Sequence, residues 1–397
     1  MSPSSASVGA APLRVLHVAS FTGNIGDNAN HLGFRSWFNA LVPQPIEWRE
    51  FEIRRVFWRE MAFDDAFVAL ANECDLLVIG GGNFFELWVK DSPSGTSISI
   101  TNERLRQIRV PILVHGLGVD IHQGVAPGNV ERFRAFLQTL RECDGLITVR
   151  NDGAVPNLRA IGIEPAEFDI LELPDGGFFA RFATDAGKRQ QRKIGINIAG
   201  DMLEQRFSGA GGTLGCPAFI ERLAAFIIGV TDRYPDLSVV LFPHIFRDLR
   251  VYCDLLDALP DRVRRGRVEV ARYGAGDGAA SLIFGEYAQC TLVLGMRFHA
   301  NVVPLAHQVP TIGLNTYMQI ENLYASLGLR ELLVDVRREG FETKLRELVD
   351  SILADATSSG VDQTVVDQID AGLGEPRERI RAWLSRRLVV ARRGAEG

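Results

Sequence analysis

Ten short apolar runs, separated by longer stretches with helical periodicity, constrain the fold of this 397-residue chain more than any other feature. Most runs are β-branched and show no apolar–polar alternation, as expected of strands buried on both faces of a parallel sheet. Amphipathic segments such as 127–143 and 216–234 predict helices between them. The pattern predicts an α/β protein. The runs are 13–20, 75–81, 110–118, 145–150, 193–200, 238–244, 267–273, 290–296, 309–315 and 332–336.

The length of the chain favours two domains over one. A polar, basic segment at 181–193 is followed at once by a new strand and is the predicted linker. We expect a disordered N-terminus (1–12), an N-terminal Rossmann-like domain (13–185), a C-terminal Rossmann-like domain (186–350) and a helical tail (351–397).

The tail contains a basic amphipathic segment at 375–393, with seven Arg against two Glu. We expect its apolar stripe to pack on the protein, with peripheral contact to an anionic membrane surface as the alternative. The stripe consists of Ile380, Trp383, Leu384, Leu388 and Ala391.

Several classes of protein are disfavoured. The net charge of −6 and the lack of nucleic-acid-binding motifs argue against a nucleic-acid partner. The five cysteines form no CxxC pair, which predicts neither a disulfide framework nor a zinc site. The first residues show no signal-peptide pattern, and no window reaches the roughly 20 apolar residues of a membrane span. We therefore expect a soluble, cytoplasmic protein.

Glycines and polar residues recur where the predicted strands end. In open parallel sheets, ligands bind beyond the carboxyl ends of the strands. Together these strand ends predict a composite cleft between two domains. The candidate residues are Gly26, Asp27, Asn28, Gly80, Gly81, Gly82, Asn83, His115, Arg150, His244, Arg297, His299 and Tyr317.

The segment "GMRFHA" (295–300) is the sharpest of these signals. In an extended backbone, Arg297 and His299 share a face while Phe298 points into the core. A permanent cation beside a group that titrates near neutrality suits a small, multiply anionic ligand. The alternative is a structural pair that neutralises a carboxylate from the other domain.

The glycine-rich segments allow two interpretations each. The triple glycine 80–82 is expected where the backbone turns sharply and approaches a ligand, or at a crowded domain interface. The segment 23–28 fits a capped strand-to-helix turn or an anion-binding helix N-terminus.

Three single side chains also allow two interpretations each. Arg150 can pair locally with Asp152 or bind a carboxylate or phosphate with both terminal nitrogens. His115 and His244 are either buried structural histidines or proton-transfer groups.

Seven motifs in this order resemble the polysaccharide pyruvyl transferase family, from about residue 14 to 330. The resemblance implies two Rossmann-like domains facing a cleft, as in GT-B glycosyltransferases. It also implies transfer of the enolpyruvyl unit of phosphoenolpyruvate to a sugar diol, giving a pyruvate ketal and phosphate, with no cofactor and no metal. The motifs are "GNIGD" (23–27), "VIGGGN" (78–83), "ITVRND" (147–152), "LPD" (173–175), "GMRFHA" (295–300), "GLNTY" (313–317) and "LGL" (327–329).

The resemblance also implies roles for single residues. Arg297 and His299 would hold the donor, and Arg150 would be a second anion clamp. Ketal formation needs two proton-transfer groups, for which we expect His299 and either His244 or His115. Two positions depart from the family pattern: Asn151 stands where the family commonly has Asp, and no lysine closely follows Tyr317.

Three functions are compatible with these observations. The first is a pyruvyl transferase acting on a polysaccharide or its lipid-linked oligosaccharide precursor. The second is a GT-B glycosyltransferase that uses a sugar nucleotide, with Glu321 as the acidic residue near the ribose. The third is a catalytically weak scaffold that binds anions or sugars. The sequence does not specify the acceptor sugar.

Overall fold

The computed structural model describes residues 11–183, 192–207, 212–354 and 363–395. Every strand pair in these residues is parallel, which confirms the predicted α/β class. The first sheet has the order β2-β1-β3-β5-β7-β8. Its strands are β1 (Leu13–Ala19), β2 (Ile46–Glu52), β3 (Leu76–Gly80), β5 (Ile112–Leu117), β7 (Leu146–Arg150) and β8 (Leu171–Leu173).

The second sheet has the order β11-β10-β9-β12-β13-β14. The strand order reverses between β9 and β12, and in the first sheet between β1 and β3. At such points neighbouring loops diverge and leave a crevice. The strands are β9 (Arg192–Asn197), β10 (Leu237–Leu241), β11 (Val268–Val270), β12 (Leu292–Gly295), β13 (Thr311–Asn315) and β14 (Leu333–Asp335).

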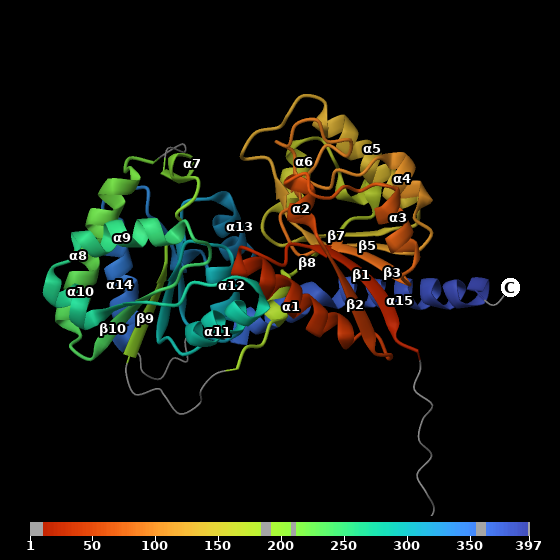
Figure 1. The fold of residues 1–397 in the computed structure, drawn as a ribbon. Helices are drawn as coiled ribbons and strands as arrows, with labels where there is room; N and C mark the ends of the chain where they lie inside the picture. Colours follow the sequence, from red (N-terminus) through yellow and green to blue (C-terminus); the bar gives the residue numbers. More distant parts are fainter. Residues whose placement is uncertain (1–10, 184–191, 208–211, 355–362, 396–397) are drawn as a thin grey trace, which may run out of the picture.

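We call residues 11–183 the N-terminal domain and residues 192–354 the C-terminal domain; they lie side by side in Figure 1. The helices of the first are α1 (Ile25–Asn39), α2 (Ile53–Phe57), α3 (Asp65–Asn72), α4 (Asn102–Gln107), α5 (Asn129–Glu142) and α6 (Ala154–Ala160). Those of the second are α7 (Leu203–Phe207), α8 (Cys216–Arg233), α9 (Asp248–Ala258), α10 (Asp261–Arg267), α11 (Gly276–Tyr287), α12 (His299–Ala306), α13 (Met318–Ser326) and α14 (Phe341–Ala354).

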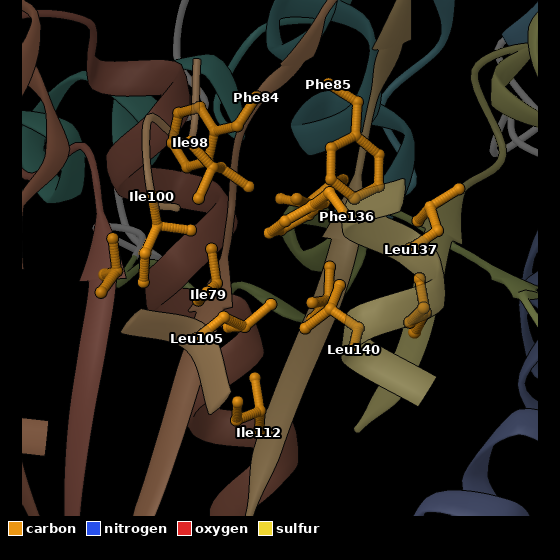
Figure 2. Packing of buried hydrophobic residues seen from close by; sticks show 14 of the residues in the cluster. Ile79, Phe84, Phe85, Ile98, Ile100, Leu105, Ile112, Phe136, Leu137 and Leu140 are labelled. Carbon is orange, nitrogen blue, oxygen red and sulfur yellow. The ribbon is translucent and has the colours of Figure 1, made fainter. Parts of the chain in front are cut away.

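Apolar side chains fill the space between each sheet and its helices. Figure 2 shows part of the N-terminal core, where Phe84, Phe85 and Phe136 pack with isoleucine and leucine side chains from β3, β5 and α5. Beside this core, a short parallel pair joins β4 (Phe85–Glu86) to β6 (Val119–Asp120). The buried Phe85 therefore fixes the position of Glu86, the next residue along the strand.

The last helix, α15 (Gln363–Ala395), contacts both domains and runs along the first sheet in Figure 1. Ile380, Trp383 and Leu384 are buried in the cluster that also holds Leu13 and Leu171. The indole N–H of Trp383 donates a hydrogen bond to a backbone carbonyl at 3.0 Å. These contacts agree with the packing interpretation of the stripe.

Some predictions concern residues or side chains that the structure does not describe. Residues 1–10, the central part of the predicted linker (184–191) and the side chain of Ala391 lie outside what the structure describes. Within the described ranges, no helix combines the length and the apolar composition that a bilayer crossing requires. Membrane contact by the tail stays a prediction.

Candidate functional site

A cavity of about 360 Å³ lies between the two domains, beyond the carboxyl ends of their strands. Its N-terminal wall comes from the loops after β1 and β3, from α2 and from the β4–β6 pair. Its C-terminal wall comes from the segments after β9, β12 and β13, so it includes the point where the second sheet reverses its strand order. Ligands bind at this place in open α/β sheets.

Arg297 occupies the turn between β12 and α12 and lines the cavity. Its Nε and Nη2 donate to Asp248 at 2.9 and 2.6 Å, and Nη2 also donates to Asp201 at 2.9 Å. Burial opposes the charge, but Asp248 and Asp201 outweigh it and raise the pKa of Arg297. The guanidinium is therefore a fixed cation whose Nη2 donates to both carboxylates.

His299 is the first residue of α12 and lines the same cavity. Its Nε2 lies 3.3 Å from Asp175 Oδ1, within ion-pair distance but without hydrogen-bond geometry. The predicted shared face of Arg297 and His299 is wrong, because the chain between them turns into a helix. Arg297 faces carboxylates of its own domain, whereas His299 faces one from the N-terminal domain.

Gly26 allows this arrangement. A Cβ atom at this position would lie 2.5 Å from His299 Nδ1, so only glycine permits α1 to approach the imidazole this closely. Gly26 thus leaves room for the His299 ring and does not line the cavity itself, in contrast to its predicted role in substrate binding.

Arg150 ends β7, and its guanidinium lies 4.7 Å from the ring centroid of Phe298. It donates from Nε to Asp152 Oδ2 at 2.5 Å and from Nη1 to Asp175 Oδ2 at 3.5 Å. Burial alone would raise the pKa of Asp175, but His299 and Arg150 outweigh it and hold that pKa at about 2. Asp175, within the "LPD" motif, is therefore an ionised carboxylate that lies within ion-pair distance of both side chains.

Arg206 on α7 also lines the cavity and was missed in the sequence analysis. Its Nη2 lies 3.4 Å from Asp201 Oδ1, the oxygen that accepts from Arg297 at 2.9 Å. Burial lowers the pKa of Arg206, and the charge of Asp201, opposed by that of Arg297, does not restore it. Two guanidiniums thus share one carboxylate oxygen of Asp201, whereas Asp248 is bound by Arg297 alone.

The opposite wall holds polar residues that the sequence analysis named only in part. Tyr317 donates from its hydroxyl to Asp120 Oδ2 at 2.8 Å across the domain boundary. Asn83 donates weakly to the same oxygen at 3.4 Å, while its own Oδ1 is buried without a partner. Asp27 lines the cavity and forms an ion pair with Arg54 at 2.9 Å.

His244 lies in the cavity wall as predicted, although its side chain is fully buried. Its Nε2 lies 3.0 Å from the Tyr287 hydroxyl, and its Nδ1 has no hydrogen-bond partner among the residues that the structure describes. Burial, with Arg297 nearby, lowers the pKa of His244 well below the usual range, so the ring is neutral at physiological pH.

His115 does not reach the cavity, which overturns its prediction as a catalytic residue. Its ring lies 4.0 Å from the centroid of Phe34 and 5.6 Å from that of Trp37. Burial lowers the pKa of His115 to about 3, and within the described part of the chain neither ring nitrogen has a hydrogen-bond partner. Asn28 is also structural, because its amide donates to Phe21 O at 2.9 Å and to Asp277 Oδ1 at 2.7 Å.

The triple glycine does not line the cavity either. A Cβ at Gly80 would lie 2.5 Å from the carbonyl oxygen of His115, and one at Gly82 would lie 2.5 Å from the Phe84 ring. Gly81 has a φ of +86°, in the left-handed region. The three glycines serve tight packing and a turn inside the N-terminal domain, so their predicted contact with substrate is wrong. Only Asn83, which follows them, reaches the cavity.

A second cavity of about 860 Å³ adjoins the first and shares Gln123, Met202 and Tyr317 with it. Glu321, the predicted ribose-binding candidate, lines this second cavity and is absent from the wall of the first.

Comparisons with known proteins agree with this architecture. The putative UDP-N-acetylglucosamine 2-epimerase of Listeria monocytogenes superposes with a TM-score of 0.54 at 12% identity, over 89% of this chain and 91% of that chain. The UDP-GlcNAc 2-epimerase of Neisseria meningitidis bound to UDP-GlcNAc superposes with a TM-score of 0.50 at 10% identity, over 91% of this chain and 100% of that chain. An α,α-trehalose-phosphate synthase (UDP-forming) of Burkholderia vietnamiensis superposes with a TM-score of 0.50 at 9% identity, over 96% of this chain and 99% of that chain. At these identities the likeness establishes the GT-B-type fold alone.

No curated protein matched the sequence. The model of the family described as "Polysaccharide pyruvyl transferase" matches residues 24–316, which include Asp27, Arg150, Asp175, Arg297 and His299. This match spans most of both domains, and the chain therefore belongs to the polysaccharide pyruvyl transferase family and is a transferase.

Proposed function

We propose that the chain transfers the enolpyruvyl unit of phosphoenolpyruvate to two hydroxyls of a sugar, forming a pyruvate ketal and releasing phosphate. The acceptor is a polysaccharide or its lipid-linked oligosaccharide precursor. The observation that carries the proposal is the convergence of Arg297 and Arg206 on one oxygen of Asp201, inside a cavity between the domains.

The charge balance of this wall suits the donor. Phosphoenolpyruvate carries a phosphate and a carboxylate, and guanidinium groups bind such anions through two parallel hydrogen bonds. The Asp201 carboxylate, whose side chain is 24% exposed, occupies the place of such an anion between the two arginines. Donor binding would displace it and place the donor's anionic groups against both arginines.

The reaction needs proton transfers as well as anion binding. The first hydroxyl adds to the central carbon while the methylene carbon gains a proton, and the second hydroxyl then displaces phosphate. His299 lies beside the ionised Asp175, which would stabilise an imidazolium, so it can hold the donor or transfer a proton. The second cavity would hold the part of the acceptor that the first cannot contain.

The test is a thermal-shift panel with phosphoenolpyruvate, UDP, GDP and CMP, because a ligand of the folded state raises apparent stability. We expect stabilisation by phosphoenolpyruvate, its loss in Arg297→Ala and incomplete recovery in Arg297→Lys, since lysine lacks the planar fork. Arg337→Ala is the matched control: Arg337 pairs with Asp335 at 2.8 Å in the same domain but lines the second cavity.

The alternatives give different results. Stabilisation by UDP or GDP without phosphoenolpyruvate would replace the proposal with a sugar-nucleotide-dependent glycosyltransferase. Phosphoenolpyruvate binding that is undiminished in Arg297→Ala would show that the donor does not occupy this wall. No stabilisation by any of the four would leave a scaffold that binds other anions or sugars.

A further inference from the structure

Two carboxylates lie side by side in the N-terminal wall of the cavity. Strands β4 and β6 pair in parallel, with Glu86 directly opposite Asp120. Neighbouring strands are about 4.8 Å apart, and residues in register point to the same face of a sheet. Both side chains line the cavity, so two carboxyl groups face the same ligand space.

The two carboxylates have different partners. Asp120 accepts hydrogen bonds from the Tyr317 hydroxyl at 2.8 Å, from Gln123 Nε2 at 2.9 Å and from the His122 backbone N–H at 2.8 Å. Asp120 thus accepts hydrogen bonds from both domains.

Glu86, by contrast, accepts from the Ser97 hydroxyl. The nearest cation, Arg54, is held by Asp27 at 2.9 Å and donates to the Ser20 hydroxyl at 2.7 Å. Within the ranges that the structure describes, no lysine, arginine or histidine nitrogen forms an ion pair with Glu86.

These surroundings favour a proton on Glu86. Burial raises the pKa of Glu86 to about 7; the neighbouring Asp120 adds to this effect, whereas the Ser97 hydroxyl and Arg54 oppose it only in part. Tyr317 is the other titratable group facing it, from the C-terminal domain. A buried carboxyl with a raised pKa that lines a cavity is a recognised candidate for a general acid.

Building on the proposed pyruvyl transfer, we infer that Glu86 is the acid that protonates the methylene carbon of the donor. The arginines that would hold the anionic groups lie in the C-terminal wall. Glu86 lies in the opposite wall beside the apolar side chains of Ile53, Phe84 and Trp88, where the uncharged methylene end of the donor would point.

The proposed step balances as follows. A C–H bond forms at the methylene carbon with the proton of Glu86, while a C–O bond forms between the central carbon and the first acceptor hydroxyl. The proton of that hydroxyl returns to the Glu86 carboxylate. The second hydroxyl then replaces the phosphate group, and its proton leaves with the phosphate.

The experiment measures proton uptake when phosphoenolpyruvate binds, by titration calorimetry in buffers of different ionisation enthalpy. An anion bound in the same cavity raises the proton affinity of Glu86, so wild type should take up a fraction of a proton between pH 7 and 8. Glu86→Gln should bind the donor with most of this uptake lost. The hydrogen bond from Ser97 lowers the pKa of Glu86. Ser97→Ala removes this bond and should therefore shift the uptake to higher pH.

Glu103→Gln, an exposed position on α4, is the matched control and should behave as wild type. Equal uptake in wild type and Glu86→Gln would overturn the assignment of Glu86 while leaving donor binding intact. Failure of wild type to bind phosphoenolpyruvate would overturn the proposed function, and the role of Glu86 with it. The two failures are therefore distinguishable.

Discussion

Replacing Asp175 by asparagine tests the electrostatic link between the domains. Asp175 is fully buried and lies 3.3 Å from His299 Nε2 and 3.5 Å from Arg150 Nη1. Its pKa falls from the ordinary 3.8 to about 2. A lowering of this size corresponds to about 2 kcal/mol of folding free energy. Asp175→Asn should therefore lower the free energy of unfolding at pH 7 by about this amount.

The lowered pKa of Asp175 also determines how its contribution to stability changes with pH. Because the pKa of Asp175 is depressed in the folded state, its stabilisation is fully present above about pH 5. It is lost as the pH falls through about 2, and about half of it should remain at pH 3. The difference between wild type and Asp175→Asn, measured by urea unfolding at several pH values, should shrink accordingly.

Asp152→Asn is the matched control, since Asp152 accepts a hydrogen bond at 2.5 Å from Arg150, the arginine that also pairs with Asp175. Burial raises the pKa of Asp152, and Arg150 offsets this only in part, so the ionised form is disfavoured in the folded state. Neutralising it should leave stability at pH 7 unchanged or higher. Equal losses in Asp175→Asn and Asp152→Asn, or a loss that does not decrease at low pH, would refute the reasoning.

Two further predictions concern packing. Gly81→Ala places a Cβ at a φ of +86° and should cost about 1–2 kcal/mol in urea unfolding, while the folded protein keeps its affinity for phosphoenolpyruvate; lost donor affinity without lost stability would return this loop to the binding site. Trp383→Ala, at a side chain only 3% exposed, should cost about 3–5 kcal/mol in the same assay. A near-neutral result, together with salt-sensitive flotation of wild type on anionic liposomes, would instead assign the stripe to a membrane surface.

The sequence by itself determined the fold class and most of the sheet strands. All ten predicted runs overlap strands of the two large sheets, because a strand buried on both faces is apolar at nearly every position. The two strands of these sheets that were missed are β2, whose sequence IEWREFE carries charges on an edge strand, and the three-residue β8. Neither presents a continuous apolar run.

The sequence also identified the Arg-x-His motif and Arg150 as cavity residues, since polar groups at parallel strand ends converge at one edge. It could not decide which way a side chain turns there. Arg297 and His299 are two residues apart, yet the start of α12 directs them to carboxylates of different domains.

Only the tertiary structure decided the identities of the remaining partners. Arg206 reaches the oxygen that binds Arg297, although they are far apart in the chain. Glu86 opposes Asp120 through a strand pair of two residues each, too short to leave any periodicity in the sequence. His115 and the triple glycine have the composition of a site but lie inside a packed core. Composition marks the strand ends, whereas burial and proximity across the domains determine which of those groups can meet a ligand.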